Sequence, residues 1–334
     1  MSDKSSKIIR RLIAGLVFGF LVFLGLVLVG DIRQVSGQVL AFQWSYYPLV
    51  LALTLFNYIL RFFKWHYYLG QVGVKEFPLL ESATLFLAGF PLAVTPGKVG
   101  EALKGVWLEK QTGLPLPKGV SVVLAERVSD GLGVLALSTL GVIAYPRYWP
   151  GFALVLGGLI ILIILIQVRP AGLWLLEVGS RLPLLKRVSN SLRNFYEGSY
   201  ALFKPKALIV AVSIGTISWL GEGIGFYFIL KGLGIPGGWN TLSSAVFVLA
   251  FSTVIGAVSA LPGGLGAAEA SIAGMLVLLL EVSKDTAAAA TLLIRFATLW
   301  FAVALGLTVW AVFRKALFNP DSRLKTRSTL PDRS

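Results

Sequence analysis

The sequence has no cysteine and a single histidine, His66, among its 334 residues. Without cysteine the chain forms no disulfide, offers no thiolate to a metal and carries no thiol nucleophile. One histidine cannot build the histidine cluster that a zinc site needs. These absences exclude redox and zinc chemistry, and we expect the protein to use no cofactor.

Charged residues are scarce as well, at 14%, whereas hydrophobic residues make up 56% of the chain. Several apolar runs reach the roughly 20 residues that a helix needs to cross a bilayer. Because lipid offers the backbone no hydrogen-bond partners, such runs cross as helices. The composition therefore predicts an all-α, polytopic membrane protein.

Basic residues outnumber acidic ones, 30 to 16, which gives a net charge of +14. In a soluble protein this balance would suggest nucleic-acid binding. Here the basic residues gather at the N-terminus, between residues 169 and 206, and after residue 313. This distribution follows the positive-inside rule. We therefore expect a multi-pass protein of the cell (cytoplasmic) membrane with both termini in the cytoplasm, and no nucleic-acid partner.

Six apolar runs are predicted to be full membrane spans: 12–29, 46–68, 119–143, 150–168, 207–230 and 286–313. The first is too long for the apolar core of a signal peptide and is interpreted as a retained anchor. The second ends in Trp65, Tyr67 and Tyr68, which are typical of an aromatic belt at the membrane surface. Arg61 and Lys64, near this end, are expected to snorkel toward lipid phosphates.

Residues 171–203 combine apolar side chains at helical spacing with basic ones on the opposite face. They predict an amphipathic helix that either lies on the cytoplasmic membrane surface or packs on the bundle as a connector. The polar residues 319–334 predict a disordered cytoplasmic tail. Residues 1–318 are expected to form a single transmembrane domain.

Two further apolar stretches, 81–110 and 240–281, are each interrupted by a Pro-Gly break, TPGKVGEALKG at 95–105 and LPGGLGAAEA at 261–270. Three predicted full spans separate the two stretches, so hairpins that return to their own side would enter from opposite faces of the membrane. We predict two re-entrant hairpins in inverted repeats, 81–143 and 240–313, as in transporters with broken helices. The expected hinge residues are Pro96, Gly97, Gly100, Pro262, Gly263, Gly264 and Gly266. Two complete crossings per stretch, or a chance similarity in a chain with 36 glycines and 15 prolines, are the alternatives.

Ionisable residues within the apolar runs are the strongest indication of a site. A charged group at membrane depth costs at least about 2.5–3.5 kcal/mol on the insertion scale. Glu126, Arg127 and Asp130 share one helix face in the third span, where they are expected to neutralise one another in part. Such groups either form buried ion pairs or line a cavity, and their number favours a cavity because buried pairs stabilise a fold poorly.

Five motifs occur in order along the chain: Arg61-Phe-Phe-Lys64-Trp65, Pro96-Gly-Lys-Val-Gly-Glu101 with Lys104, Glu126-Arg127 with Asp130, Leu261-Pro-Gly-Gly-Leu-Gly266 with Glu269, and Arg295. Together they resemble the lysylphosphatidylglycerol synthase/flippase transmembrane family over about residues 10–315. The resemblance implies a domain that moves lipids with bulky polar head groups between leaflets. The aminoacyl-transfer domain of well-known members does not carry over to this chain, and Lys98 and Lys104 stand where arginine is expected more often.

The sequence and the resemblance together predict a flippase-like lipid transporter and not an enzyme. Its partners would be membrane lipids: an anionic phospholipid, an aminoacylated lipid or a glycolipid. No Walker A motif is present, so movement would be downhill or coupled to an ion. The predicted substrate-binding residues are Lys98, Glu101, Lys104, Glu126, Arg127, Asp130, Glu222, Glu269, Arg295 and Arg61.

We expect most of these side chains to line one pocket that opens sideways to lipid. Two alternatives remain open from the sequence. One is a proton-coupled carrier of a small solute that uses Glu126, Asp130 or Glu222 as a proton relay. The other is a non-catalytic membrane partner of a lipid-modifying enzyme such as a glycosyltransferase.

Overall fold

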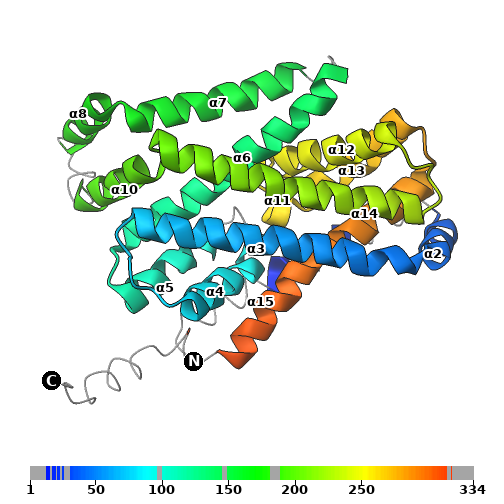
Figure 1. Cartoon of the computed structure of the whole chain (residues 1–334), viewed down its shortest axis with the longest axis horizontal. Helices are drawn as coiled ribbons and strands as arrows, with labels where there is room; N and C mark the ends of the chain where they lie inside the picture. The colour runs from blue at the N-terminus through cyan, green and yellow to red at the C-terminus, as the bar shows by residue number, and fades with distance from the viewer. Residues whose placement is uncertain are drawn as a thin grey trace.

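The structure is a computed structural model that describes residues 13–15, 17–19, 21–22, 25, 31–95, 100–144, 149–180, 189–313 and 317. Every regular element within these ranges is a helix, which confirms the all-α prediction. The longest helices run along the long axis of the molecule or obliquely to it (Figure 1). They are α3 (Tyr47–Gln71), α6 (Leu116–Ala144), α7 (Trp149–Gln167), α11 (Pro205–Gly232), and α14 (Lys284–Arg295) continued by η6 (Phe296–Trp300) and α15 (Phe301–Val312).

These long helices agree with five of the six predicted spans within a few residues. Six helical segments of the described residues are long and apolar enough to cross a membrane: 44–71, 149–167, 205–232, 239–258, 262–280 and 284–312. The predicted span 119–143 corresponds to the 29-residue helix α6, which is not among these six segments. Half of the residues of the predicted span 12–29 lie outside the described residues. The chain is thus a multi-pass helical membrane protein.

The helix surfaces agree with a lipid environment. Only Phe152 and Ile166 are buried among the described side chains of the 19-residue helix α7. Its exposed residues include Leu154 and Ile161, at 79% and 59% relative exposure. Apolar faces of this size are not left in water by a folded protein, so we infer that α7 faces lipid.

The first broken stretch forms short helices. It comprises α4 (Leu79–Ala88), the 3₁₀ turn η2 (Phe90–Val94) and α5 (Leu103–Thr112). Ten residues rise only about 15 Å, roughly half the thickness of the hydrocarbon core. Pro96, Gly97 and Lys98 lie outside the described residues.

The second broken stretch forms α12 (Trp239–Val258), the turn η5 (Pro262–Gly264) and α13 (Ala267–Leu280). In Figure 1, α12 and α13 lie toward one end of the long axis, and α4 and α5 toward the other. Residues 239–258 and 262–280 are both long enough to cross by length and composition. The re-entrant hairpins and the inverted repeats therefore stay predictions.

Glycine makes the second break possible. Gly263, Gly264 and Gly266 have φ angles of +62°, +68° and +88°, a region that other residues adopt at a cost. A β-carbon on Gly264 would lie 2.9 Å from the Cα of Gly256, so the break packs against the backbone of α12. A β-carbon on Gly263 would lie 3.3 Å from Val94 Cγ1, so the two breaks, distant in sequence, are adjacent in space.

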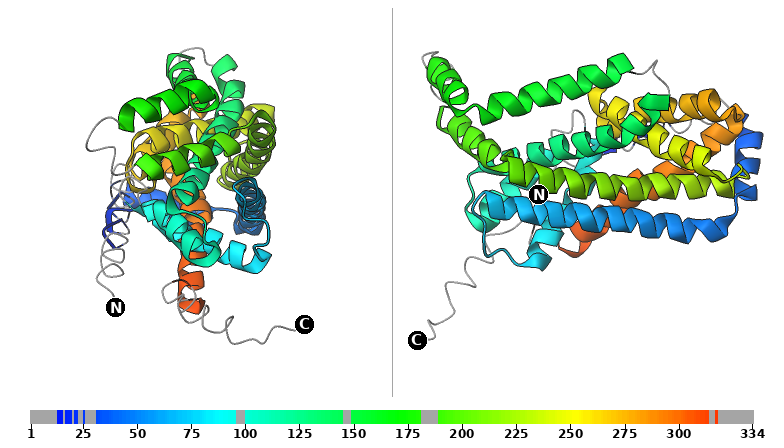
Figure 2. Two further views of the ribbon diagram at one scale, coloured as in Figure 1. Left: turned by 90° about the vertical axis from the view of Figure 1, so that its left-hand side faces the viewer. Right: turned by 45° about the horizontal axis from the view of Figure 1, so that its top comes forward.

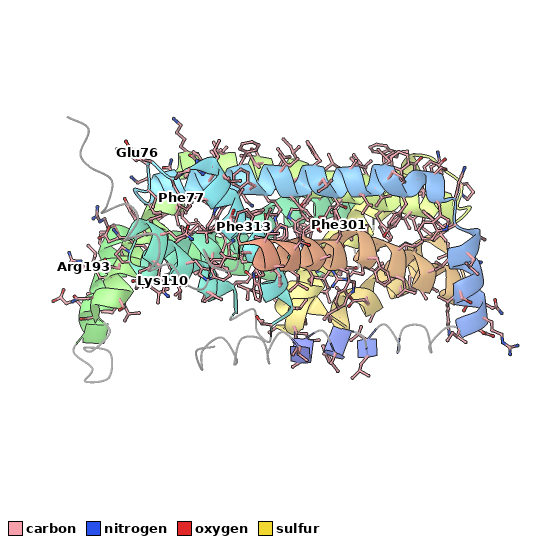
Figure 3. The ribbon with its side chains drawn as sticks, turned by 90° about the horizontal axis from the view of Figure 1, so that it is seen from below. Glu76, Phe77, Lys110, Arg193, Phe301 and Phe313 are labelled. Atoms are coloured by element: carbon pink, nitrogen blue, oxygen red, sulfur yellow. The ribbon has the colours of Figure 1, made fainter. Side chains whose placement is uncertain are left out.

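Short helices cover the two ends of the bundle. The helix α2 (Ile32–Ala41) is capped by Asp31 and packs on α14. At the opposite end, α8 (Arg169–Ser180) and α10 (Ser189–Leu202) occupy part of the predicted amphipathic segment (Figure 2). The helix α10 packs on α6 and buries Tyr196 and Leu202. Charged residues such as Lys110 and Arg193 lie at this same end (Figure 3).

The aromatic-belt interpretation of the second span is wrong for two of its residues. The side chains of Trp65 and Tyr68 are fully buried, each at 0% exposure. They belong to an apolar cluster formed with residues of α4, α5 and α6. Residues of the first broken stretch cover this end of α3, so these rings face protein and not the membrane surface.

Candidate functional site

A cavity of about 400 Å³ lies where α3, α6, α11 and α14 meet the two breaks. Aromatic and small apolar residues form much of its wall, among them Tyr58, Phe90, Trp219 and Leu299. Among the described residues, seven charged side chains also line it: Arg61, Glu101, Lys104, Arg127, Asp130, Glu222 and Arg295.

Two glutamate–arginine pairs with the same spacing in the sequence meet at this cavity. Arg127 Nε donates to Glu101 Oε2 at 2.9 Å, and Arg295 Nε donates to Glu269 Oε1 at 2.5 Å. In both pairs the glutamate precedes the arginine by 26 residues. Each glutamate also follows one of the two breaks. The two halves of the chain therefore build the same local unit on separate helices.

The carboxylates hold both arginines by the Nε side of the guanidinium group. Arg127 Nη1 is 4.0 Å from Asp130 Oδ2, and Arg295 Nη2 donates to the carbonyl of Gly263 at 3.2 Å. Glu269 is fixed in turn, because its other oxygen accepts the backbone N–H of Gly266 at 2.6 Å. This arrangement orients the guanidinium groups while terminal nitrogens remain at the cavity.

Asp130 joins α3 to α6. Its carboxylate accepts a hydrogen bond from Lys64 Nζ and forms an ion pair with Arg61 Nη2 at 3.2 Å. The expectation that Arg61 and Lys64 snorkel to lipid phosphates is therefore wrong. Lys64 is fully buried, and both side chains turn inward because Asp130 supplies their counter-charge. The guanidinium carbon of Arg61 also lies 5.5 Å from the centre of the Trp219 ring.

Lys104 and Glu126 form a further buried pair, with 2.7 Å between Nζ and Oε2. The helices that carry them approach closely, because a β-carbon on Gly119 would lie 2.8 Å from the Cα of Gly105. The Lys104 ammonium also lies 4.0 Å from the centre of the Trp65 ring. The predicted neutralisation within α6 is found in part, as the Arg127–Asp130 pair at 4.0 Å, and the shorter ion pairs of these residues join different helices.

Glu222 differs from the other acids of the site. Its side chain lines the cavity from the middle of α11 and is 5% exposed. No basic side chain of the described residues forms an ion pair with it. Gly221 and Gly223, on either side, let α11 contact Phe56 of α3 and Val246 of α12 closely. The position of Glu222 is therefore fixed by close helix packing.

Most of the predicted site residues come together here. Arg61, Glu101, Lys104, Arg127, Asp130, Glu222 and Arg295 line the cavity, and so do the hinge residues Gly263 and Gly264. Glu126 and Glu269 lie behind the wall, where they hold Lys104 and Arg295. Lys98, Pro96 and Gly97 are outside the described residues.

Three side chains of the site were missed from the sequence. Lys64 was assigned to the membrane surface, and Tyr58 and Trp219 were not singled out. A signal existed for the two aromatic residues, because Tyr58 precedes Arg61 by one helical turn and Trp219 precedes Glu222 by one turn. Residues three apart on a helix share a face, so a charged residue that faces a cavity identifies aromatic neighbours as wall residues.

Comparison with known proteins agrees with this fold. A family model described as the lysylphosphatidylglycerol synthase TM region matches residues 12–306. A UPF0104 membrane protein of Methanothermobacter thermautotrophicus is 26% identical over 320 residues, which cover 90% of this chain and 92% of the relative. A UPF0104 membrane protein of Methanocaldococcus jannaschii is 28% identical over 184 residues, which cover 53% of this chain and 74% of the relative. The chain belongs to the lysylphosphatidylglycerol synthase transmembrane family.

Proposed function

We propose that the protein is a flippase-like transporter, and not an enzyme, that moves a lipid with a bulky polar head group between leaflets. The observation that carries this proposal is the single cavity at which both breaks and both glutamate–arginine pairs meet. Small-molecule sites typically measure roughly 300–1,000 Å³. A cavity of about 400 Å³ accommodates a head group and leaves the acyl chains in the bilayer.

Arg127 and Arg295 are the proposed ligands of the lipid phosphate. Guanidinium groups suit phosphate because their donors form a planar fork. Each is held by a carboxylate at Nε, so it is oriented before the lipid arrives. The side chains of Arg127 and Arg295 are 36% and 13% exposed, so both can be reached from the cavity. Replacing either one also leaves a buried glutamate without its base, so the stability of each variant has to be measured beside its transport.

The two broken stretches are the proposed gates. Their turns touch at Val94 and Gly263, between helices that lie toward opposite ends of the bundle. Movement of either turn would open the cavity toward one side of the membrane, as in transporters with inverted repeats. A head group also needs a path from the lipid phase, so we propose that the cavity opens sideways when one gate moves.

The test uses phosphatidylcholine vesicles that contain the purified protein and a trace of fluorescently labelled phosphatidylglycerol. Dithionite added outside quenches the outer label, and translocation appears as continued quenching of the inner label. Arg127→Gln and Arg295→Gln should each slow translocation at least tenfold. Arg169→Gln is the matched control, because Arg169 is 52% exposed at its side chain and pairs with Glu197 on the surface.

Two outcomes would count against the assignment. If both variants translocate phosphatidylglycerol at the wild-type rate, the arginines do not bind the phosphate. If the wild-type protein moves none of several labelled lipids, including a glycolipid and an aminoacylated lipid, the transporter proposal fails. Chromatographic monodispersity of each variant separates lost function from misfolding.

A further inference from the structure

The formal charges of the described side chains in and directly behind the cavity balance when all of them are ionised. Of the described residues, five are basic and five acidic: Arg61, Lys64, Lys104, Arg127 and Arg295, against Glu101, Glu126, Asp130, Glu222 and Glu269. Four of the five acids form ion pairs with bases, and Asp130 pairs with three of them: Lys64, Arg61 and, at 4.0 Å, Arg127. The four paired acids and the five bases leave a surplus of one positive charge. Glu222, the fifth acid, is the group that offsets it.

The charged groups around Glu222 come from several helices. The groups that act on it electrostatically are Arg61 of α3, Arg295 of α14 and Asp130 of α6, and the Tyr58 hydroxyl of α3 lies in the same wall. The helix α12, which packs on α11, has no titratable residue. On α11 itself the neighbour one turn away is Trp219, which does not titrate in this range. Glu222 is therefore an unpaired acid in a wall that also carries Arg61, Arg295 and Asp130.

A lipid phosphodiester carries one negative charge. With Glu222 ionised, the ten side-chain charges cancel, and the phosphodiester would leave the buried set with an uncompensated negative charge. Such a charge is costly in a region of low dielectric constant. With Glu222 protonated, the set has one net positive charge, which the phosphodiester neutralises.

We propose that Glu222 takes up one proton when an anionic lipid head group binds, and that the proton and the lipid cross the membrane together. This inference rests on the proposed transport function and adds its driving force. The proton comes from water and bonds to a carboxylate oxygen of Glu222, and it returns to water when the head group leaves. A head group whose phosphate is balanced by its own amine brings no net charge, so it binds without proton uptake.

The experiment measures protons taken up per lipid bound. Short-chain dihexanoyl phosphatidylglycerol is titrated into the purified protein by calorimetry in two buffers that differ in ionisation enthalpy. Above the pH at which Glu222 titrates, the wild-type protein should take up close to one proton per lipid, and its affinity should fall about tenfold per pH unit. Dihexanoyl phosphatidylcholine should bind without uptake.

Variants assign the proton to Glu222. Glu222→Gln mimics the protonated side chain, so proton uptake should disappear and the affinity should no longer depend on pH. Glu281→Gln is the control, since Glu281 is an exposed acid at the end of α13, and it should keep the wild-type uptake. Glu222→Asp keeps the carboxyl group and should retain uptake, which covers the case in which the glutamine variant does not fold.

Lipid binding without proton uptake by the wild-type protein would overturn this inference and leave the proposed transport function intact. Equal uptake with both short-chain lipids, or undiminished uptake by Glu222→Gln, would also overturn it. Failure of the transport proposal has a different signature: no labelled lipid would cross in the vesicle assay at any pH or under an imposed proton gradient.

Discussion

Replacing the buried pair Lys104–Glu126 with two isoleucines should leave the protein folded, although either single replacement should damage it. The two side chains are 3% and 1% exposed and are joined at 2.7 Å. In the second half of the chain, isoleucines occupy the two corresponding positions. The offset between the two glutamate–arginine pairs is 269 − 101 = 295 − 127 = 168 residues. The same offset maps Lys104 to Ile272 and Glu126 to Ile294, which are 1% and 0% exposed.

The expected changes in the free energy of unfolding follow from the burial of the pair. Lys104→Ile or Glu126→Ile alone leaves one uncompensated buried charge, which costs about 3–5 kcal/mol. The double replacement removes both charges, and substitutions of this kind range from neutral to about 1–4 kcal/mol stabilising. The double variant also loses the contact between the Lys104 ammonium and the Trp65 ring, which lowers its stability by up to about 2 kcal/mol. We therefore expect the double variant to lie between about 2 kcal/mol less stable and about 4 kcal/mol more stable than the wild-type protein.

Reversible unfolding in mixed micelles with increasing SDS measures these free energies. The wild-type protein, the two single variants and the double variant form a double-mutant cycle. Its interaction energy should be several kcal/mol, with the double variant more stable than either single variant. A double variant as unstable as the sum of the single ones would refute the reasoning, because the cost would then come from packing and not from charge.

Two further changes test the break and the arginine clamp. Gly264→Ala should destabilise the protein by at least about 1 kcal/mol in the same unfolding assay, because φ is +68° and the new β-carbon would meet the backbone of α12. Gly274→Ala on α13 meets no atom within 4 Å, so it should be neutral or stabilise the protein by up to about 1 kcal/mol. Glu269→Gln should slow lipid translocation at least tenfold, because the amide holds Arg295 more weakly. Wild-type translocation by this variant would show that the carboxylate does not position the arginine.

The elements of this fold were recognisable from the sequence because their signals are local. Apolar runs of sufficient length predicted α3, α7 and α11, and the Pro-Gly pairs predicted the break before Glu269. Arg127 and Arg295 were recognisable as site residues because a charged residue inside an apolar run needs a reason to be there. Each of these inferences uses neighbours along one segment.

The partners of the charged residues were not recognisable, because they depend on how separate helices pack. Glu126 and Asp130 share a face of α6, yet each is bonded to a base from a different helix, Lys104 of α5 and Lys64 of α3. The sequence assigned Lys64 to the membrane surface because aromatic residues follow it. Burial of Trp65 by the first broken stretch is a tertiary effect that no local pattern reports.

The correspondence between the two halves of the chain does not extend to Asp130, where several charged side chains meet. The offset of 168 residues maps Asp130 to Thr298, which lies in the π-helical turn η6 directly after Arg295. The carbonyl of Thr298 accepts a hydrogen bond from the Tyr58 hydroxyl at 2.6 Å, whereas Asp130 forms ion pairs with three bases. Wider π-helical turns occur often at functional sites. The first half thus supplies most of the charge and the second half most of the apolar wall. In the proposed transport, both arginines contact the phosphate, while the polar remainder of the head group finds partners toward α6. Under this proposal, the repeated glutamate–arginine unit would set where the phosphate binds, and the residues that differ between the halves would set which way the head group faces.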